Sequence, residues 1–229
     1  FRNRLMLPVI DTRGDVVAFG SRVLDGSEPK YMNSSETPVY SKRRVLYGLN
    51  LAKKTKRPNI ILCEGNLDIV TLHQAGFDNA VASMGTSLTV EQIRLLSRFT
   101  RELVLCYDND NAGKVATERA LQLLDNSEFT VKVLQLPRRL VDGAYVKQDA
   151  DDFIKFQGPD AFERLLSGSE NGVEFRMAQV AGKYDLQNDE ARVAYCEEIS
   201  TLLASLPSAV EREIYTPALL KLPASHPKP

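Results

Sequence analysis

Two periodicities of apolar residues alternate through the middle of the chain. Short apolar runs have the length and composition of buried strands, and they lie at 59–63, 80–83, 103–107 and 130–136. Between and after these runs, apolar residues recur at helical spacing, at 67–75, 89–99, 112–124 and around 159–166. Strands that alternate with helices indicate a parallel sheet covered by helices on both faces. We therefore predict an α/β fold with a Rossmann-like sheet.

The N-terminal region follows a different pattern. Residues 5–10 and 16–20 flank the polar stretch Asp11-Thr12-Arg13-Gly14, which predicts a β-hairpin. Residues 21–44 are basic and interrupted by prolines, so we expect loops there. A short helix is predicted at 50–56, before Pro58. This region predicts part of a basic α+β subdomain that precedes the sheet.

The C-terminal region contains helical patterns and no predicted strand. Helices are expected at 173–183 and 189–205, and residues 223–229 have the composition of a frayed tail. We therefore divide the chain into a basic subdomain at 1–48, an α/β domain at 49–168 and a small helical subdomain at 169–229. The chain begins at Phe1 without an initiator Met, and we expect it to be part of a longer protein.

Charge is distributed unevenly, although the 229 residues have a formal net charge of only −1. Residues 1–57 carry twelve Lys and Arg against five Asp and Glu, a net charge of +7, and the remainder carries −8. A basic part joined to an acidic part indicates a polyanionic partner on one side and metal ions on the other. A solvated basic surface is the alternative that charge counting leaves open.

Cysteines, histidines and hydropathy limit the chemistry further. Cys63 and Cys106 lie inside apolar runs, so we expect buried free thiols and a reducing, cytoplasmic environment. With only His73 and His226 available, we expect no zinc site in this chain. No run of eighteen or more apolar residues is present, so we expect no membrane partner.

Three groups of carboxylates follow predicted strands or lie just beyond them, and they are Glu64 with Asp68, Asp108 with Asp110, and Asp149 with Asp151. The carboxyl ends of strands in an open α/β sheet share one edge, so these groups can meet. Six carboxylates in one place repel each other unless a cation lies among them. Mg²⁺ or Mn²⁺ is the natural occupant, because hard divalent ions prefer oxygen ligands. The sequence therefore predicts metal-dependent phosphate chemistry.

Structural explanations exist for single members of this set. Asp68 can equally cap the N-terminus of a helix, whereas that explanation is weak for Glu64, which directly follows an apolar strand. An isolated Asp-x-Asp such as Asp108-Asn109-Asp110 is often only a turn. The three groups together are the stronger signal.

Longer motifs connect these carboxylates to a known family. The spacing Glu64-Gly65-x-x-Asp68, Asp108-x-Asp110-x-Ala112-Gly113 and Asp149-x-Asp151 resembles the TOPRIM module of primases, topoisomerases and some nucleases. Flanking segments resemble the basic motifs of bacterial DnaG-type primases, and they include Phe19-Gly20-x-Arg22, Pro29-Lys30-Tyr31-Met32-Asn33-Ser34, Lys42, Leu46-Tyr47-Gly48 and Gly85-Thr86-Ser87-Leu88-Thr89. The resemblance extends from residue 1 to about residue 168.

The resemblance implies a role for each matching residue. Glu64 would be the central catalytic acid, with Asp108 and Asp110 as catalytic residues and principal metal ligands. Asp68, Asp149 and Asp151 would complete a site for two or more Mg²⁺ or Mn²⁺ ions. A basic face for nucleotide and nucleic acid would consist of Arg22, Lys30, Tyr31, Asn33 and Lys42. Ordinary surface lysines are the alternative for Lys30 and Lys42.

The family resemblance also implies an activity. The chain would take part in DNA-directed synthesis of short RNA primers on single-stranded DNA, by metal-dependent nucleotidyl transfer from ribonucleoside triphosphates at a bacterial replication fork. A replicative helicase would be bound through a C-terminal domain that we expect to be absent here, as we expect for the family's zinc-binding domain. We therefore expect the isolated chain to synthesise primers poorly or not at all.

Two other classes of function remain open. A TOPRIM nuclease would cleave DNA with Mg²⁺ and without nucleotides, and a topoisomerase would need a nucleophilic tyrosine, for which this chain has no recognisable context. A non-enzymatic module that binds nucleotide or DNA is the third reading, and the intact acidic set argues against it.

Overall fold

A computed structural model describes residues 1–85 and 87–217 of the chain. Thr86, from one of the motifs above, and the predicted tail at 223–229 lie outside the described residues. The chain divides into two compact units, Phe1–Glu170 and Asn171–Pro229. Among the described helices, none is long and apolar enough to span a membrane.

An antiparallel sheet of three strands begins the first unit, and its strands are β1 (Arg4–Ile10), β2 (Val16–Val23) and β3 (Tyr31–Asn33). The predicted hairpin β1–β2 is confirmed. Its turn is held by Asp11, whose Oδ1 accepts hydrogen bonds from the backbone N–H groups of Arg13, Gly14 and Asp15. Gly14 adopts a φ of 106°. Strand β3 was missed, because three residues within a polar region carry too little alternation to be recognised.

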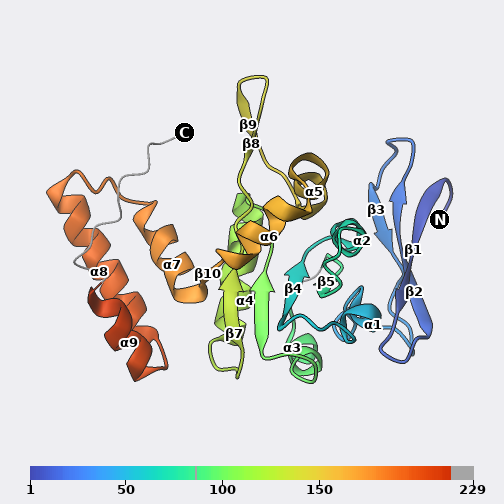
Figure 1. The fold of residues 1–229 in the computed structure, drawn as a ribbon, viewed down its shortest axis with the longest axis horizontal. Coiled ribbons are helices and arrows are strands. Elements are labelled where there is room, and N and C mark those ends of the chain that lie inside the picture. The colour runs from blue at the N-terminus through green and yellow to red at the C-terminus, as the bar shows by residue number, and fades with distance from the viewer. Residues whose placement is uncertain (86, 218–229) are drawn as a thin grey trace. The chain divides into compact units, whose positions relative to one another are not determined.

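The central sheet has the order β10-β7-β6-β4-β5. Its strands are β4 (Asn59–Cys63), β5 (Ala80–Ala82), β6 (Glu102–Leu105), β7 (Thr130–Val133) and β10 (Glu170–Asn171). The pairs β4–β5, β4–β6 and β6–β7 are parallel. The helices of this unit are α1 (Leu49–Ala52), α2 (Asn66–Gln74), α3 (Val90–Leu96), α4 (Asn111–Leu124), α5 (Ala150–Gln157) and α6 (Pro159–Ser167). The predicted α/β fold with a mostly parallel sheet is confirmed (Figure 1).

Both faces of the central sheet are buried, which explains why its strands are continuous apolar runs. Ile61 and Val104 on one face pack with Phe162 of α6, in a core to which α2 and α5 also contribute. Ile60 and Leu103 alternate with these residues and are almost fully buried as well. The free thiols Cys63 and Cys106 are buried at the strand ends, as predicted.

Several elements after β7 were not predicted, and they include helix α5, strand β10 and a hairpin. A hairpin of β8 (Arg139–Val141) and β9 (Ala144–Val146) interrupts the expected polar loop. Its two-residue turn, Asp142-Gly143, has φ values of 49° and 80°, and Asp-Gly is a strong hairpin signal that sequence analysis could have used. Helix α5 follows directly, with Asp149 as its N-cap.

The second unit is helical, with α7 (Gly172–Ala181), α8 (Asp189–Ser205) and α9 (Ala209–Tyr215). The first two correspond to the predicted helices, and α9 was missed. Tyr195, Ile199 and Leu203 of α8 recur at helical spacing and are buried in the core of this unit. Polar N-caps at Asn171, Asn188 and Ser208 begin the three helices.

The N-terminal sheet is joined to the central sheet by backbone and side-chain contacts. The backbone of Tyr47 exchanges two hydrogen bonds with that of Ala82 at the end of β5. Just beyond, Met84 is buried with Val9 and Tyr40, and its carbonyl accepts a hydrogen bond from Asn33 Nδ2 at 3.4 Å. These contacts place strands β2 and β3 opposite the carboxyl ends of β4 and β6.

Candidate functional site

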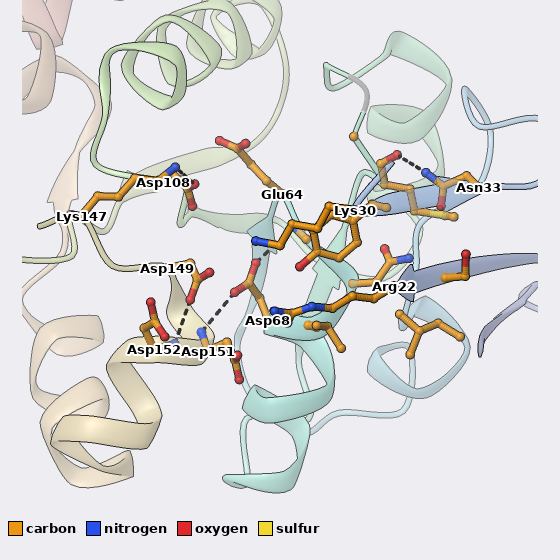
Figure 2. A pocket seen from close by; sticks show the side chains of 18 of the residues that line it. Arg22, Lys30, Asn33, Glu64, Asp68, Asp108, Lys147, Asp149, Asp151 and Asp152 are labelled. Carbon is orange, nitrogen blue, oxygen red and sulfur yellow. Dashed lines mark hydrogen bonds and ion pairs between the residues drawn. The ribbon is translucent and has the colours of Figure 1, made fainter. Parts of the chain in front are cut away.

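A cavity of about 520 Å³ lies where the N-terminal sheet meets the carboxyl ends of the central strands. One wall comes from β2 and β3 and carries Arg22, Lys30, Tyr31 and Asn33. The other wall comes from the central sheet and from the starts of α2 and α5, and its acidic residues are Glu64, Asp68, Asp108, Asp149, Asp151 and Asp152. Figure 2 shows Arg22 and Lys30 extending toward the acidic wall. The cavity therefore brings basic and acidic groups face to face.

Glu64 directly follows β4, and Asp68 lies in the first turn of α2. Burial, with the negative charge of Asp108 nearby, raises the pKa of Glu64 above its usual value. The Oε1 atom of Glu64 is buried, and no described residue makes a hydrogen bond to it. Buried oxygens without partners are uncommon in proteins, so this atom marks a place for a ligand.

Asp68 is more deeply buried and holds two segments together. Its Oδ2 accepts the N–H of Gly65 at 3.2 Å, and its Oδ1 accepts the N–H of Asp151 at 3.1 Å. Burial, reinforced by the charge of Asp149, raises the pKa of Asp68 to about 7. Asp68 therefore caps its own helix, as the structural alternative supposed, and also lies in the wall of the cavity.

Asp108 and Asp110 follow β6 and share one cation. Lys147, just after β9, places its Nζ 3.1 Å from Asp108 Oδ2 and 2.9 Å from Asp110 Oδ2. Asp110 is also the N-cap of α4, because its Oδ1 accepts the N–H of Gly113 at 2.8 Å. That hydrogen bond, together with Lys147, lowers the pKa of Asp110. Both carboxylates do reach one cation, and in this structure the cation is a lysine.

The start of α5 carries the densest group of carboxylates. Ligand atoms of Asp149, Asp151 and Asp152 all lie within 4.8 Å of one another. The buried Asp151 accepts hydrogen bonds from Thr71 Oγ1 and from Lys155 Nζ, the latter at 2.6 Å. Three closely spaced oxygen donors are a suitable set for a hard divalent ion.

Tyr31 is the centre of the basic wall. Its ring is flanked by two cations, with the Arg22 guanidinium carbon 5.7 Å and the Lys30 Nζ 5.6 Å from the ring centroid. Cations at this distance from an aromatic ring are attracted to its face. The arrangement holds two positive charges at the cavity, and among the described residues no acidic side chain of the same wall forms an ion pair with them.

The structure brings together most of the predicted site residues. Two of them, Asp110 and Lys42, are not among the described residues that line the cavity. Asp110 lies beside it, bonded to Lys147 and to the start of α4. Lys42 makes backbone contacts instead, with its N–H bonded to Glu36 and its carbonyl to Gln92.

Sequence analysis missed three charged residues of the cavity, Asp152, Lys147 and Lys155. Asp152 could have been found from its helical position beside Asp149 and Asp151. The two lysines carried no such signal, since their partners depend on how the hairpin and α5 pack.

Three family models match the chain. The DNA primase catalytic core, N-terminal domain, matches residues 1–53. A Toprim-like model matches 61–154, and the DnaB-helicase binding domain of primase matches 173–217. The last match corrects our expectation that the helicase-binding domain is absent from this chain. The domain was missed because the helical region contains no sharp sequence motif.

Known proteins with similar sequences and structures agree with these models. The DNA primase of Clostridium acetobutylicum is 39% identical over 216 residues, which cover 94% of this chain and 35% of that protein. A solved DnaG primase catalytic domain bound to single-stranded DNA has a TM-score of 0.78 and 33% identity, over 96% of this chain and 70% of the other. The RNA polymerase domain of Mycobacterium tuberculosis primase, in complex with double-stranded DNA, has a TM-score of 0.82 and 31% identity. The match covers 97% of this chain and 71% of that one.

A Toprim-like sheet with an acidic edge, joined to a basic sheet that matches the N-terminal domain of a primase catalytic core, defines the class of this chain as a primase-type catalytic core. The chain belongs to the family of bacterial DnaG-type DNA primases. It spans about a third of the length of the curated relatives that it matches.

Proposed function

We propose that this chain carries the catalytic centre for RNA primer synthesis on single-stranded DNA. The observation that supports this most directly is the single cavity with a basic wall and an acidic wall. Template-directed nucleotidyl transfer needs both, because the triphosphate and the template are polyanions and the reacting phosphate needs divalent ions.

The acidic wall suits Mg²⁺ or Mn²⁺. Asp149, Asp151 and Asp152 would hold one ion, and the partnerless Oε1 of Glu64 is available to a second ion together with Asp108. When bound, such ions would activate the attacking 3′-oxygen and offset the charge on the leaving pyrophosphate. Asp68 would hold the starts of α2 and α5 together, because it accepts hydrogen bonds from the backbone N–H groups of Gly65 and Asp151.

The basic wall would orient the nucleotide. Lys30 and Arg22 would contact the phosphates of a ribonucleoside triphosphate, and Tyr31 between them offers a ring face for a base. The 3′-hydroxyl oxygen would form a bond to the α-phosphorus, the bond from that phosphorus to the bridging oxygen would break, and pyrophosphate would leave. Glu64, which lines the cavity, would accept the hydroxyl proton.

The test is formation of a dinucleotide on a single-stranded template, measured with a labelled ribonucleoside triphosphate and Mn²⁺. We expect slow, metal-dependent product from the wild-type chain, none from Glu64→Gln, and wild-type levels from Lys132→Met, whose ion pair with Glu102 lies outside the cavity. Equal product from the wild type and Glu64→Gln would contradict the proposal. DNA cleavage with Mg²⁺ and no nucleotide would instead assign the site to nuclease chemistry.

We also propose that the helical unit contacts a replicative helicase, on the basis of its match to the helicase-binding model. Val210 and Ile214 lie one turn apart on α9 and are both exposed, which gives an apolar stripe suited to a partner. We expect Val210→Ser with Ile214→Ser to weaken binding to the helicase at least tenfold in a titration, roughly the loss of two buried side chains. Unchanged affinity would exclude this stripe as the contact.

A further inference from the structure

The Nζ of Lys147 lies between Asp108 and Asp110, where a metal ion bound by these two carboxylates would lie. Its Nζ lies 2.9–3.1 Å from one oxygen of each carboxylate, at normal hydrogen-bond distance. Figure 2 shows the lysine chain reaching across to Asp108. A lysine ammonium group carries its positive charge at physiological pH.

The lysine is attached to a hairpin that is partly exposed. It follows strand β9 directly, and the paired residues Leu140 and Tyr145 of the hairpin are exposed. Arg139 at the start of the hairpin contacts helix α5, with its guanidinium carbon 3.6 Å from the centroid of the Phe156 ring. Lys147 therefore joins the end of the β8–β9 hairpin to the acidic edge.

An ammonium group and a divalent ion cannot share the same carboxylate oxygens, because two like charges within about 4 Å repel each other strongly. We propose that Lys147 is an internal counter-cation, which competes with the metal for Asp108 and Asp110 and is released into the cavity when the metal binds. The inference rests on the proposed function, since it requires that the acidic edge binds metal.

Release would connect metal binding to substrate binding. Lys147 also lines the cavity, so a displaced ammonium group would become available to a phosphate of the nucleotide or template. The lysine would thus offset part of the negative charge of the metal-free site, and it would attract the anion only after the metal is in place.

The test compares Mn²⁺ binding by calorimetry for the wild type, Lys147→Met and the control Lys132→Met. Both variants lose one positive charge, but Lys147 pairs with Asp108 and Asp110, whereas the partner of Lys132 is Glu102, away from the cavity. We expect Lys147→Met to bind Mn²⁺ about fivefold more tightly, a modest gain because the lysine is more than half exposed. The control should match the wild type. In EDTA we expect the Tm of Lys147→Met to be about 2–4 °C lower, with the deficit removed by Mn²⁺.

A second measurement leaves Lys147 in place. The chain contains no tryptophan, so a Tyr145→Trp variant carries one indole on the hairpin. We expect Mn²⁺ to shift its emission at the same concentrations that saturate the calorimetric signal. If the wild type binds Mn²⁺ but the emission stays constant, or if Lys147→Met binds no more tightly, the inference is overturned and the proposed function stands. If the wild type binds no Mn²⁺, both fail.

Discussion

Gly113 lies directly against the carbonyl oxygen of Asp108. A Cβ atom built on Gly113 would come within 1.9 Å of that oxygen, and the N–H of Gly113 donates to the Asp110 side chain. The start of α4 therefore folds back onto the end of β6 at a distance that only glycine permits. This approach fixes where the carboxylates of Asp108 and Asp110 point.

We expect Gly113→Ala to destabilise the protein by about 1–3 kcal/mol, because the backbone must shift to make room for the methyl group. Mn²⁺ binding should weaken with it, since the shift moves Asp108. Gly168→Ala is the control, because a Cβ there meets its nearest atom at an ordinary 3.6 Å. Urea unfolding and calorimetry measure both effects, and a Gly113→Ala variant as stable as the wild type would refute the argument.

Asp68 makes the metal-free protein sensitive to pH. Its pKa is about 7 in the folded chain and near 4 when unfolded, so between these values the folded chain binds a proton that the unfolded chain does not. The free energy of unfolding of the wild type, relative to that of Asp68→Asn, should therefore fall as pH rises from about 4 to about 7, and it should level off above pH 7. Urea unfolding in EDTA measures this, with the exposed Asp142→Asn as control. A difference between wild type and Asp68→Asn that is constant with pH would contradict the assignment.

Thr71 supports the buried carboxylate of Asp151 from the neighbouring helix α2. We expect Thr71→Val to cost about 1 kcal/mol of unfolding free energy, because one acceptor of a buried carboxylate loses its donor while Lys155 remains bonded. Thr71→Ser keeps the hydroxyl group and should retain most of the stability. If valine and serine behave alike in urea unfolding, the hydrogen bond does not contribute.

Lys30 and Lys42 should have different functions, although the motif groups them together. We expect Lys30→Ala to weaken triphosphate binding about tenfold, since Lys30 lines the cavity. Lys42→Ala should leave triphosphate binding unchanged and weaken the binding of single-stranded DNA. The dependence of DNA affinity on salt concentration should then correspond to the release of about one counterion fewer. Equal loss of triphosphate affinity in both variants would show that Lys42 reaches the nucleotide.

The predicted parts of the fold are those with long apolar periodicity. The four main strands of the parallel sheet and helices such as α8 were predicted, because burial on both faces or on one stripe leaves a clear pattern. Strand β3 and the β8–β9 hairpin are only three residues per strand, too short for such a pattern.

The acidic wall was predictable because its carboxylates follow strands, and parallel strands end at one edge. Lys147 was not predictable, because its partners lie 39 and 37 residues away and are set by the position of a hairpin. Lys42 was assigned from a motif alone, which does not reveal whether a side chain faces a cavity. Residue type and strand order thus predicted most of the acidic wall, and tertiary packing determined where the lysines lie.

The most direct test of the account is calorimetric binding of a ribonucleoside triphosphate with and without Mn²⁺, to the wild type, Asp108→Ala and Lys30→Ala. One cavity with two walls predicts binding that requires Mn²⁺, is lost without Asp108 and is about tenfold weaker without Lys30. Binding that is independent of Mn²⁺ and unaffected by Asp108→Ala would contradict it.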